Sequence, residues 1–319
     1  MVEILKGIRA LTVLLSLAIV SCTASCAGEA GVEIKDGWRN KYGYIDKNGD
    51  IVIEPKYGMA HEFSEGLALI DNIGYIDKNG TIAIEQEYWD GNPFSGGVAC
   101  VLEKGGVQYG YIDRSGDYVI EPRFNHAFSF SEGLARIWTN NTPEGGQTGF
   151  INIAGEYVIP PEMQPFEYGG DTGDFHEGIA LTSRYGFINS NGKTVIEDGR
   201  FTDARRFSEG LAAAQKVGGV WGYIDTTGTM VIEPKYDDAG IFSEGLAAVS
   251  IDGRWGYIDS AGDMIIEPQY EDAGIFSEGL AAVKIDGKWG YIDKNGSMVI
   301  EPQYEDAGYF SEGLAPVKF

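Results

Sequence analysis

Two short motifs alternate along most of this 319-residue sequence. The first is Gly-Tyr-Ile-Asp, with the variant Gly-Phe-Ile-Asn, and it occurs eight times at intervals of 31 to 39 residues. The second is Phe-Ser-Glu-Gly-Leu-Ala, with two looser copies, and one copy follows each copy of the first. A repeat of this length is one small structural unit that must bury its apolar faces against neighbouring units. The first motif begins at Gly43, Gly74, Gly110, Gly149, Gly186, Gly222, Gly256 and Gly290, and the second at Phe63, Phe94, Phe130, Phe175, Phe207, Phe242, Phe276 and Phe310.

The repeat at residues 280–312 predicts three antiparallel strands followed by an irregular return segment. Asp-Gly after the first strand and Asn-Gly after the second are strong hairpin signals, because these residues accept the positive φ that such turns need. After residue 21, apolar residues do not recur at helical spacing, so we predict an all-β fold. The predicted strands are residues 280–285, 289–293 and 297–300, the turns are Asp286-Gly287 and Asn295-Gly296, and Pro302 ends the third strand.

Eight such three-stranded meanders can stack in two ways, as an open β-solenoid or superhelical array, or as a closed β-propeller of about eight blades. A first-strand pattern occurs at residues 32–37 as well as at residues 314–319, which gives nine first strands for eight of each other strand. A closed ring has no place for a ninth strand, whereas an open stack can use it as a cap. Pro316 interrupts the last copy, as is typical of an edge strand. We therefore expect the open array and keep the closed propeller as the alternative.

The last three repeats carry Trp-Gly at Trp221-Gly222, Trp255-Gly256 and Trp289-Gly290. Together with Lys288, the last of these resembles the signature of the WG-repeat (KWG-repeat) proteins of bacteria. The resemblance covers residues 32–319, although Tyr42, Ile73, Tyr109, Thr148 and Tyr185 stand where the upstream copies would have Trp. This family is defined by its repeat, so the resemblance implies no catalytic residues.

The N-terminal segment predicts a cellular address. Lys6 and Arg9 precede an apolar run at residues 10–20, which is too short to span a bilayer and is typical of a secretory signal peptide. The run ends in Ile19-Val20-Ser21-Cys22, which resembles the lipobox of bacterial lipoproteins. That resemblance implies cleavage before Cys22, lipidation of its thiol, and a lipid-anchored protein of the bacterial cell envelope, at the outer membrane, in the periplasm or on the cell surface. The predicted domains are a lipoprotein signal peptide at residues 1–21, a flexible tether at 22–31 and the WG-repeat array at 32–319.

Charge and motifs exclude several classes of function. The formal net charge of −24 argues against a nucleic-acid partner, because phosphate contacts need a Lys/Arg surface. No nucleophile, zinc or phosphate-loop motif occurs, so we expect no enzyme, no metal site and no cofactor. The three histidines, His61, His126 and His176, are interpreted as surface loop residues.

Two sets of repeated residues are candidates for function. The Glu of each Phe-Ser-Glu-Gly segment is interpreted as structural, accepting backbone N–H bonds, because a residue present in every unit does not make one special pocket. The repeated aromatic residues either form the core or, if exposed, stack on sugar rings. The candidate ligand-binding residues are Trp221, Trp255, Trp289, Tyr223, Tyr257 and Tyr291.

The sequence therefore predicts a non-enzymatic, lipid-anchored repeat protein that binds or scaffolds a protein or peptide partner. Its acidic surface would attract a basic partner, and the lipid anchor would be its contact with a membrane. The alternative is a glycan- or cell-wall-binding module that uses exposed Trp and Tyr of the repeats.

Overall fold

A computed structural model describes residues 37–70, 74–85, 88–139, 146–163 and 173–319. The predicted signal peptide, tether, lipidation site Cys22 and N-terminal extra strand lie outside these residues. Throughout the described part of the chain the regular elements are β-strands, in agreement with the all-β prediction. No helix among the described residues is long and apolar enough to cross a bilayer.

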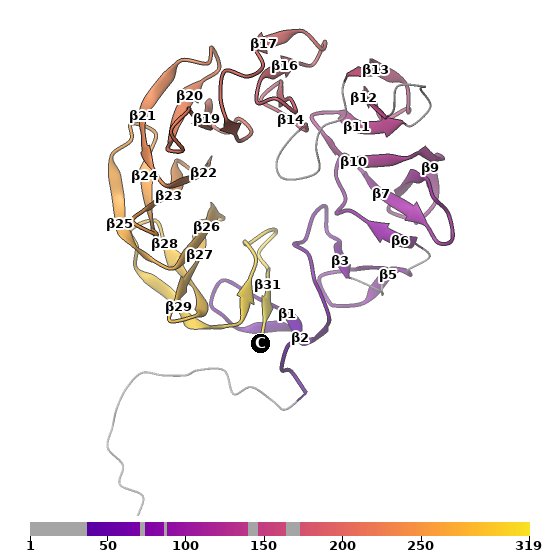
Figure 1. Ribbon diagram of the computed structural model, residues 1–319. Helices are drawn as coiled ribbons and strands as arrows, with labels where there is room; N and C mark the ends of the chain where they lie inside the picture. The colour runs from indigo at the N-terminus through magenta and orange to yellow at the C-terminus, as the bar shows by residue number, and fades with distance from the viewer. Residues whose placement is uncertain (1–36, 71–73, 86–87, 140–145, 164–172) are drawn as a thin grey trace, which may run out of the picture. The chain divides into compact units, whose positions relative to one another are not determined.

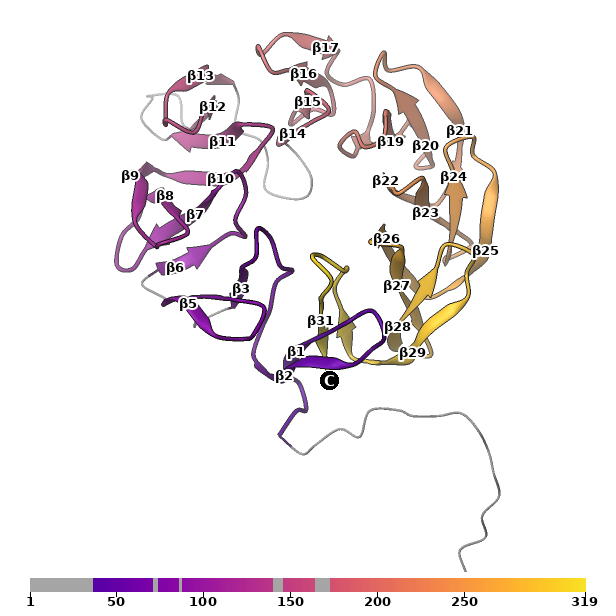
Figure 2. The same cartoon turned by 180° about the vertical axis from the view of Figure 1, so that it is seen from behind.

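The strands form eight small antiparallel sheets that follow one another around a ring, which is the architecture of a β-propeller (Figure 1). Seven sheets have four strands and one has three. In each sheet, here called a blade, the first strand lies nearest the centre of the ring and the last lies at the rim, as both views show (Figure 2).

The strands of the blades have the following bounds. Blade 1 contains β30 (Asp306–Ala307), β31 (Ala315–Lys318), β1 (Tyr42–Ile45) and β2 (Ile51–Tyr57), and blade 2 contains β3 (Ala68–Ile70), β4 (Gly74–Ile76) and β5 (Ile82–Glu85). Blade 3 contains β6 (Tyr88–Gly91), β7 (Val98–Glu103), β8 (Tyr109–Asp113) and β9 (Tyr118–Phe124), and blade 4 contains β10 (His126–Ser131), β11 (Leu134–Thr139), β12 (Gln147–Ile151) and β13 (Tyr157–Met163). Blade 5 contains β14 (Phe175–His176), β15 (Ile179–Leu181), β16 (Phe187–Asn189) and β17 (Thr194–Ile196), and blade 6 contains β18 (Asp203–Ala204), β19 (Leu211–Gln215), β20 (Trp221–Asp225) and β21 (Met230–Tyr236). Blade 7 contains β22 (Asp238–Ser243), β23 (Leu246–Ile251), β24 (Arg254–Asp259) and β25 (Met264–Tyr270), and blade 8 contains β26 (Asp272–Ser277), β27 (Leu280–Ile285), β28 (Lys288–Asp293) and β29 (Met298–Tyr304).

The expected open β-solenoid is wrong, because the two ends of the array share blade 1. The strand order of this blade is β2-β1-β31-β30, so β1 pairs with β31 from Tyr42–Lys318 to Ile45–Ala315. The C-terminal strand, counted from the sequence as surplus, therefore supplies the second strand of the first blade and closes the ring. Pro316 lies in this interior strand, beyond the pairs that join it to β30. The inner strand of blade 8 has a register shift at the equivalent place, and proline is tolerated at such irregular positions.

The three-stranded meander is also incomplete as a description of the repeat. The return segment contains the inner strand of the next blade, as β26 shows for residues 272–277. The third predicted strand does not end before Pro302 but continues to Tyr304. Because β29 is the outermost strand of its blade, Pro302 removes a donor only from a free edge. Proline at an edge also hinders pairing with other chains.

The glycine of the Trp-Gly pair allows the outer strand to approach the third strand of the blade. A Cβ on Gly256 would lie 2.4 Å from the carbonyl oxygen of Ile266 and 2.7 Å from the nitrogen of Pro268. The same backbone atoms crowd Gly290, at 2.5 Å from the oxygen of Ile300 and 2.7 Å from the nitrogen of Pro302. The Gly of the Trp-Gly pair and the Glu-Pro segment of the outer strand thus contact each other closely through their backbones.

Replacing Gly256 by Ala should therefore destabilise the protein by about 1–3 kcal/mol, because the new methyl group meets backbone rather than a movable side chain. Chemical denaturation followed by circular dichroism measures the change. The matched control is Gly58→Ala, since a Cβ at Gly58 meets no atom within 4 Å. Equal stability of the two variants would contradict this account of the motif.

Candidate ligand-binding site

The three candidate tyrosines lie in the core between blades. Tyr223, Tyr257 and Tyr291 are each 0% exposed. Each hydroxyl donates a hydrogen bond to a carbonyl of the next inner strand, at 2.8 to 2.9 Å. Each ring packs on the Phe of the same strand, with ring centres 4.8 to 4.9 Å apart. These tyrosines hold adjacent blades together and present no face to a ligand.

The three candidate tryptophans are spread over three blades instead of gathering in one site. Trp221 is buried in a core cluster, and Trp255 is half-buried and packs against the next one. Trp289 is also half-buried. Cationic groups lie over two of these rings, with Arg205 5.3 Å from the centre of Trp221 and Lys284 5.8 Å from that of Trp289. Neighbouring side chains thus cover a large part of each indole.

The repeated glutamates are structural, as interpreted from the sequence. The carboxylate of Glu278 accepts the N–H of Gly313 in the next blade, at 3.1 to 3.2 Å, and that of Glu312 closes the ring onto Gly66 at 3.0 Å. The Ser before each of these Glu donates to a Phe carbonyl of the next blade, as Ser277 does to Phe310 at 2.6 Å. The same carboxylate contact occurs at Glu65, Glu132, Glu177, Glu209 and Glu244.

The Asp-Lys-Asn-Gly-Asp turns use their acidic groups internally. Asp46 accepts the backbone N–H groups of Asn48 and Asp50 through one oxygen, at 2.9 Å each. Within the described ranges no three His, Cys, Asp or Glu residues gather in a way that could hold a metal ion.

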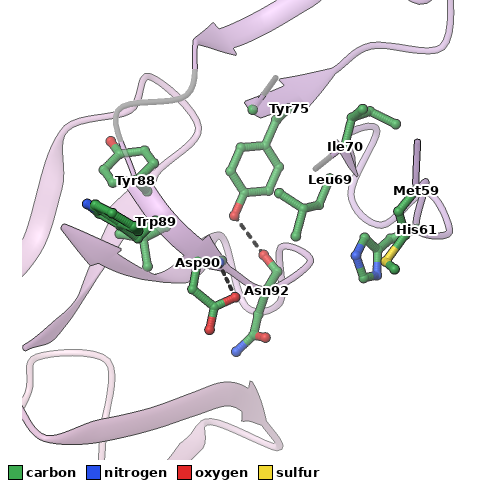
Figure 3. A pocket seen from close by; sticks show the side chains of 12 residues that line it. Met59, His61, Leu69, Ile70, Tyr75, Tyr88, Trp89, Asp90 and Asn92 are labelled. Carbon is green, nitrogen blue, oxygen red and sulfur yellow. Dashed lines mark hydrogen bonds between the residues drawn. The ribbon is translucent and has the colours of Figure 1, made fainter. Parts of the chain in front are cut away.

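A pocket of about 370 Å³ opens between blades 2 and 3 (Figure 3). Tyr88 and Trp89 stand on one side of it, Met59 and His61 on the other, and Tyr75 between them. Its volume falls within the range of ligand-binding pockets, and its lining of apolar groups with a few polar ones is typical of such sites. The lining residues are Met59, His61, Leu69, Ile70, Gly74, Tyr75, Tyr88, Trp89, Asp90, Gly91, Asn92 and Val101.

The pocket lies beside two strands of blade 2 that are shorter than their equivalents in blade 8. The strands β3 and β4 have three residues each, whereas β27 and β28 have six. The ladder of blade 2 ends at the pair Ile70–Gly74, which lines the pocket, while in blade 8 two further pairs extend beyond the equivalent position.

Trp89 is the most exposed large aromatic side chain among the described residues, at 67%. It follows Tyr88 on β6. The equivalent residue before β26 of blade 8 is Glu271, which follows Tyr270. The next residue, Asp90, is held in place, since its Oδ1 accepts the Gly91 N–H at 2.9 Å and its Oδ2 accepts the Tyr109 hydroxyl at 3.1 Å.

Sequence reasoning missed these residues. His61, interpreted as a loop residue, lines the pocket, and His126 lies in β10 instead of a loop. The signal that could have located the site is a break in the repeat. Trp89 stands where the last three repeats have an acidic residue, and it follows the repeat with the shortest first hairpin. Cys100 is buried as a small apolar residue and donates to the carbonyl of Ala127 at 3.3 Å.

A closed ring of eight antiparallel blades defines a β-propeller protein, and this one has a pocket between two of its blades. The description "WG containing repeat" matches seven segments, residues 42–71, 73–106, 109–141, 185–219, 221–255, 255–289 and 289–319. The chain therefore belongs to the WG-repeat family. The unmatched stretch contains the repeat that begins at Gly149.

Solved structures with a similar chain trace come from several bacteria. AztD from Citrobacter koseri, without ligand, is 12% identical with a TM-score of 0.47, and the match covers 87% of this chain and 98% of that one. Virginiamycin B lyase from Staphylococcus aureus is 14% identical with a TM-score of 0.41, covering 70% and 92% of the two chains. The extracellular domain of the one component system BT4673 from B. thetaiotaomicron is 12% identical with a TM-score of 0.40, covering 77% and 41%. These likenesses assign no activity or ligand to this chain. A comparison with curated protein sequences found no match.

The interblade glutamates should make stability depend on pH. Burial alone would raise the pKa of Glu312, but hydrogen bonds from Lys78 and the Gly66 N–H, together with the charge of Lys78, lower it below its ordinary value of 4.5. The same balance lowers the pKa of Glu244 and Glu278. Because the folded state holds these carboxylates ionised, their contribution is present above about pH 4.5 and is lost as the pH falls through the lowered pKa values.

The triple variant Glu244→Gln, Glu278→Gln and Glu312→Gln should lose roughly 0.5 kcal/mol per site at pH 7, since these pairs are partly exposed. The difference from the native protein should shrink between about pH 5 and pH 3, measured by denaturation at each pH. The matched control replaces three exposed glutamates of the Glu-Pro segments, Glu233, Glu267 and Glu301, with the same change in net charge. A pH-independent difference, or an equal effect of the control, would contradict the assignment.

Proposed function

We propose that this WG-repeat propeller is a non-enzymatic glycan-binding protein whose ligand occupies the pocket between blades 2 and 3. The observation that carries the proposal is the exposed indole of Trp89 above a pocket with polar groups at its floor. An exposed indole presents a flat apolar surface on which the C–H face of a sugar ring packs.

The polar lining supports the same ligand class. Asp90, Asn92 and His61 bring carboxylate, amide and imidazole groups to one pocket, and these are donors and acceptors for sugar hydroxyls. The apolar side chains of Met59 and Leu69 cover the opposite wall. Polar groups beside apolar side chains fix the orientation of a bound ring.

A binding role is favoured over hydrolysis because Asp90 is the one carboxylate among the lining residues that the structure describes. Glycoside hydrolysis ordinarily uses two carboxyl groups that flank the scissile bond. Phosphoryl and nucleophilic chemistry would need motifs that this sequence lacks.

A basic protein or peptide partner is the second candidate. An Asp recurs at one position of the inner strands, at Asp90, Asp203, Asp238, Asp272 and Asp306. An acidic array of this kind would attract a basic partner by long-range electrostatics. It would bind through several blades and would not depend on the pocket.

Replacing Trp89 by Ala should abolish retention on the bound glycan while the fold is kept, because other repeats carry small or polar residues at this position, such as Gly58, Asn125 and Glu271. A glycan array and a peptidoglycan pull-down measure retention, and circular dichroism checks the fold. The matched control is Tyr157→Ala, which removes another exposed aromatic side chain, 51% exposed on β13 of blade 4. Undiminished glycan retention by Trp89→Ala would overturn the assignment of the pocket, and binding of basic peptides alone would favour the second candidate.

We also propose that the protein is anchored to the bacterial cell envelope by lipid at Cys22, on the basis of the lipobox-like Ile19-Val20-Ser21-Cys22. Several buried acyl carbons would bind it firmly to a membrane, at ~0.8 kcal/mol for each CH₂ group. The variant Cys22→Ser should move the protein from the membrane fraction to the soluble fraction. Cys26→Ser is the matched control and should stay with the membrane. Retention of Cys22→Ser in the membrane fraction would contradict this proposal.

A further inference from the structure

Asp90 differs from its equivalents in other blades in what lies opposite it. In blades 8 and 1, Asp272 pairs across the ladder with Lys284, and Asp306 pairs with Lys318. Asp238 of blade 7 forms an ion pair with Arg205 of blade 6 at 2.8 Å. In blade 3, the residue opposite Asp90 is Leu102. The remaining equivalents, Asp203 and Asp238, lie opposite the polar residues Gln215 and Ser250. Of these five inner-strand carboxylates, Asp90 is therefore the one opposite an apolar side chain.

No Lys or Arg of the described chain forms an ion pair with Asp90. Its two recorded partners, the Gly91 N–H and the Tyr109 hydroxyl, are neutral donors. A carboxylate has about four acceptor sites, so Asp90 keeps capacity for further donors. Burial lowers the pKa of the nearby His126, and the negative charge of Asp90 opposes this lowering. His126 is therefore mainly uncharged at neutral pH and offers Asp90 no compensating cation.

The groups around Asp90 suit a positive charge. The indole of Trp89 adjoins Asp90 and is the best ring for a cation–π contact. The thioether of Met59 and the ring of Tyr75 complete a lining that contains no Lys or Arg. An ammonium group placed between the indole face and the carboxylate would meet both favourable interactions at once.

We infer that the ligand of this pocket carries a cationic amine next to its ring surface, as an amino sugar with a free amine does. The inference deepens the proposed glycan-binding function and rests on it. An N-acetylated or neutral sugar can still stack on Trp89 but has no charge for Asp90. An acidic sugar would bring a second negative charge to the same place.

The test compares two β-1,4-linked disaccharides by calorimetry, one of glucosamine and one of N-acetylglucosamine, at a pH at which the amines are protonated. We expect about five- to tenfold tighter binding of the glucosamine disaccharide, from one cation–π contact and one partly exposed ion pair. Asp90→Asn should remove this preference, because the neutral amide has no negative charge for the protonated amine. Choline and its neutral isostere 3,3-dimethylbutanol serve as competitors that separate the ammonium charge from the sugar ring.

The matched control is Asp272→Asn, which removes the equivalent carboxylate outside the pocket with the same change in net charge. It should leave the preference unchanged. Equal binding of the two disaccharides, or loss of the preference in both variants, would overturn the inference while the proposed glycan function stands. Binding of neither disaccharide and no competition by choline would overturn both. Should Asp90→Asn fold poorly, Tyr109→Phe, which loosens the Asp90 carboxylate, should lower the preference severalfold, and an unchanged preference would count against the inference.

Discussion

The ring depends on one turn that joins the inner two strands of a blade, which is Ser-Glu-Gly in six blades, His-Glu-Gly in blade 5 and Ser-Gly-Gly in blade 3. Its Glu adopts a positive φ of 51 to 56°, a conformation that costs a non-glycine residue about 1–3 kcal/mol. Asn or Gly would adopt it more easily, so we attribute the presence of Glu to its longer side chain, which reaches the next blade. The carboxylate of Glu278 bonds to the next blade while the hydroxyl of Ser277 bonds to the same strand, and these two contacts offset the strain. Seven of the eight turns carry this Glu, and the contact from Glu312 to Gly66 joins the last repeat to the first part of the ring.

Other repeated residues serve the same joints, which explains why repetition and function separate in this molecule. A residue present in every blade occupies the same environment each time, so its identity reports the needs of the scaffold. Tyr257 and Gly256 are examples, the first bonded to the next inner strand and the second crowded by the outer strand. The pocket lies where this regularity fails, at the short β3–β4 ladder and at Trp89.

Local features of the fold could be predicted from the sequence because they depend on neighbouring residues. The strand at Leu280–Ile285 and the Asp286-Gly287 turn, with φ values of 49° and 77°, are where the sequence places them. Closure was predicted wrongly because it depends on pairing between Tyr42 and Lys318, at opposite ends of the array, and no local pattern distinguishes a capping strand from one that completes another blade. The site was missed for a related reason, since Trp and Tyr were sought where they recur, and recurrence in this ring means burial.

The comparison of blades also shows that an unchanged residue can acquire a new role when its neighbour changes. Asp90 and Asp272 occupy the same inner-strand position, and nothing in either residue distinguishes them. The difference lies across the ladder, where Leu102 stands in place of Lys284. Removing the cation leaves a carboxylate whose charge is balanced by no side chain of the described protein, beside an indole that the last three repeats replace with an acidic residue. In a repeat protein, a ligand site is therefore indicated by the two residues that face each other across a ladder, and not by either residue alone. The ligand then supplies the charge that the facing residue lacks.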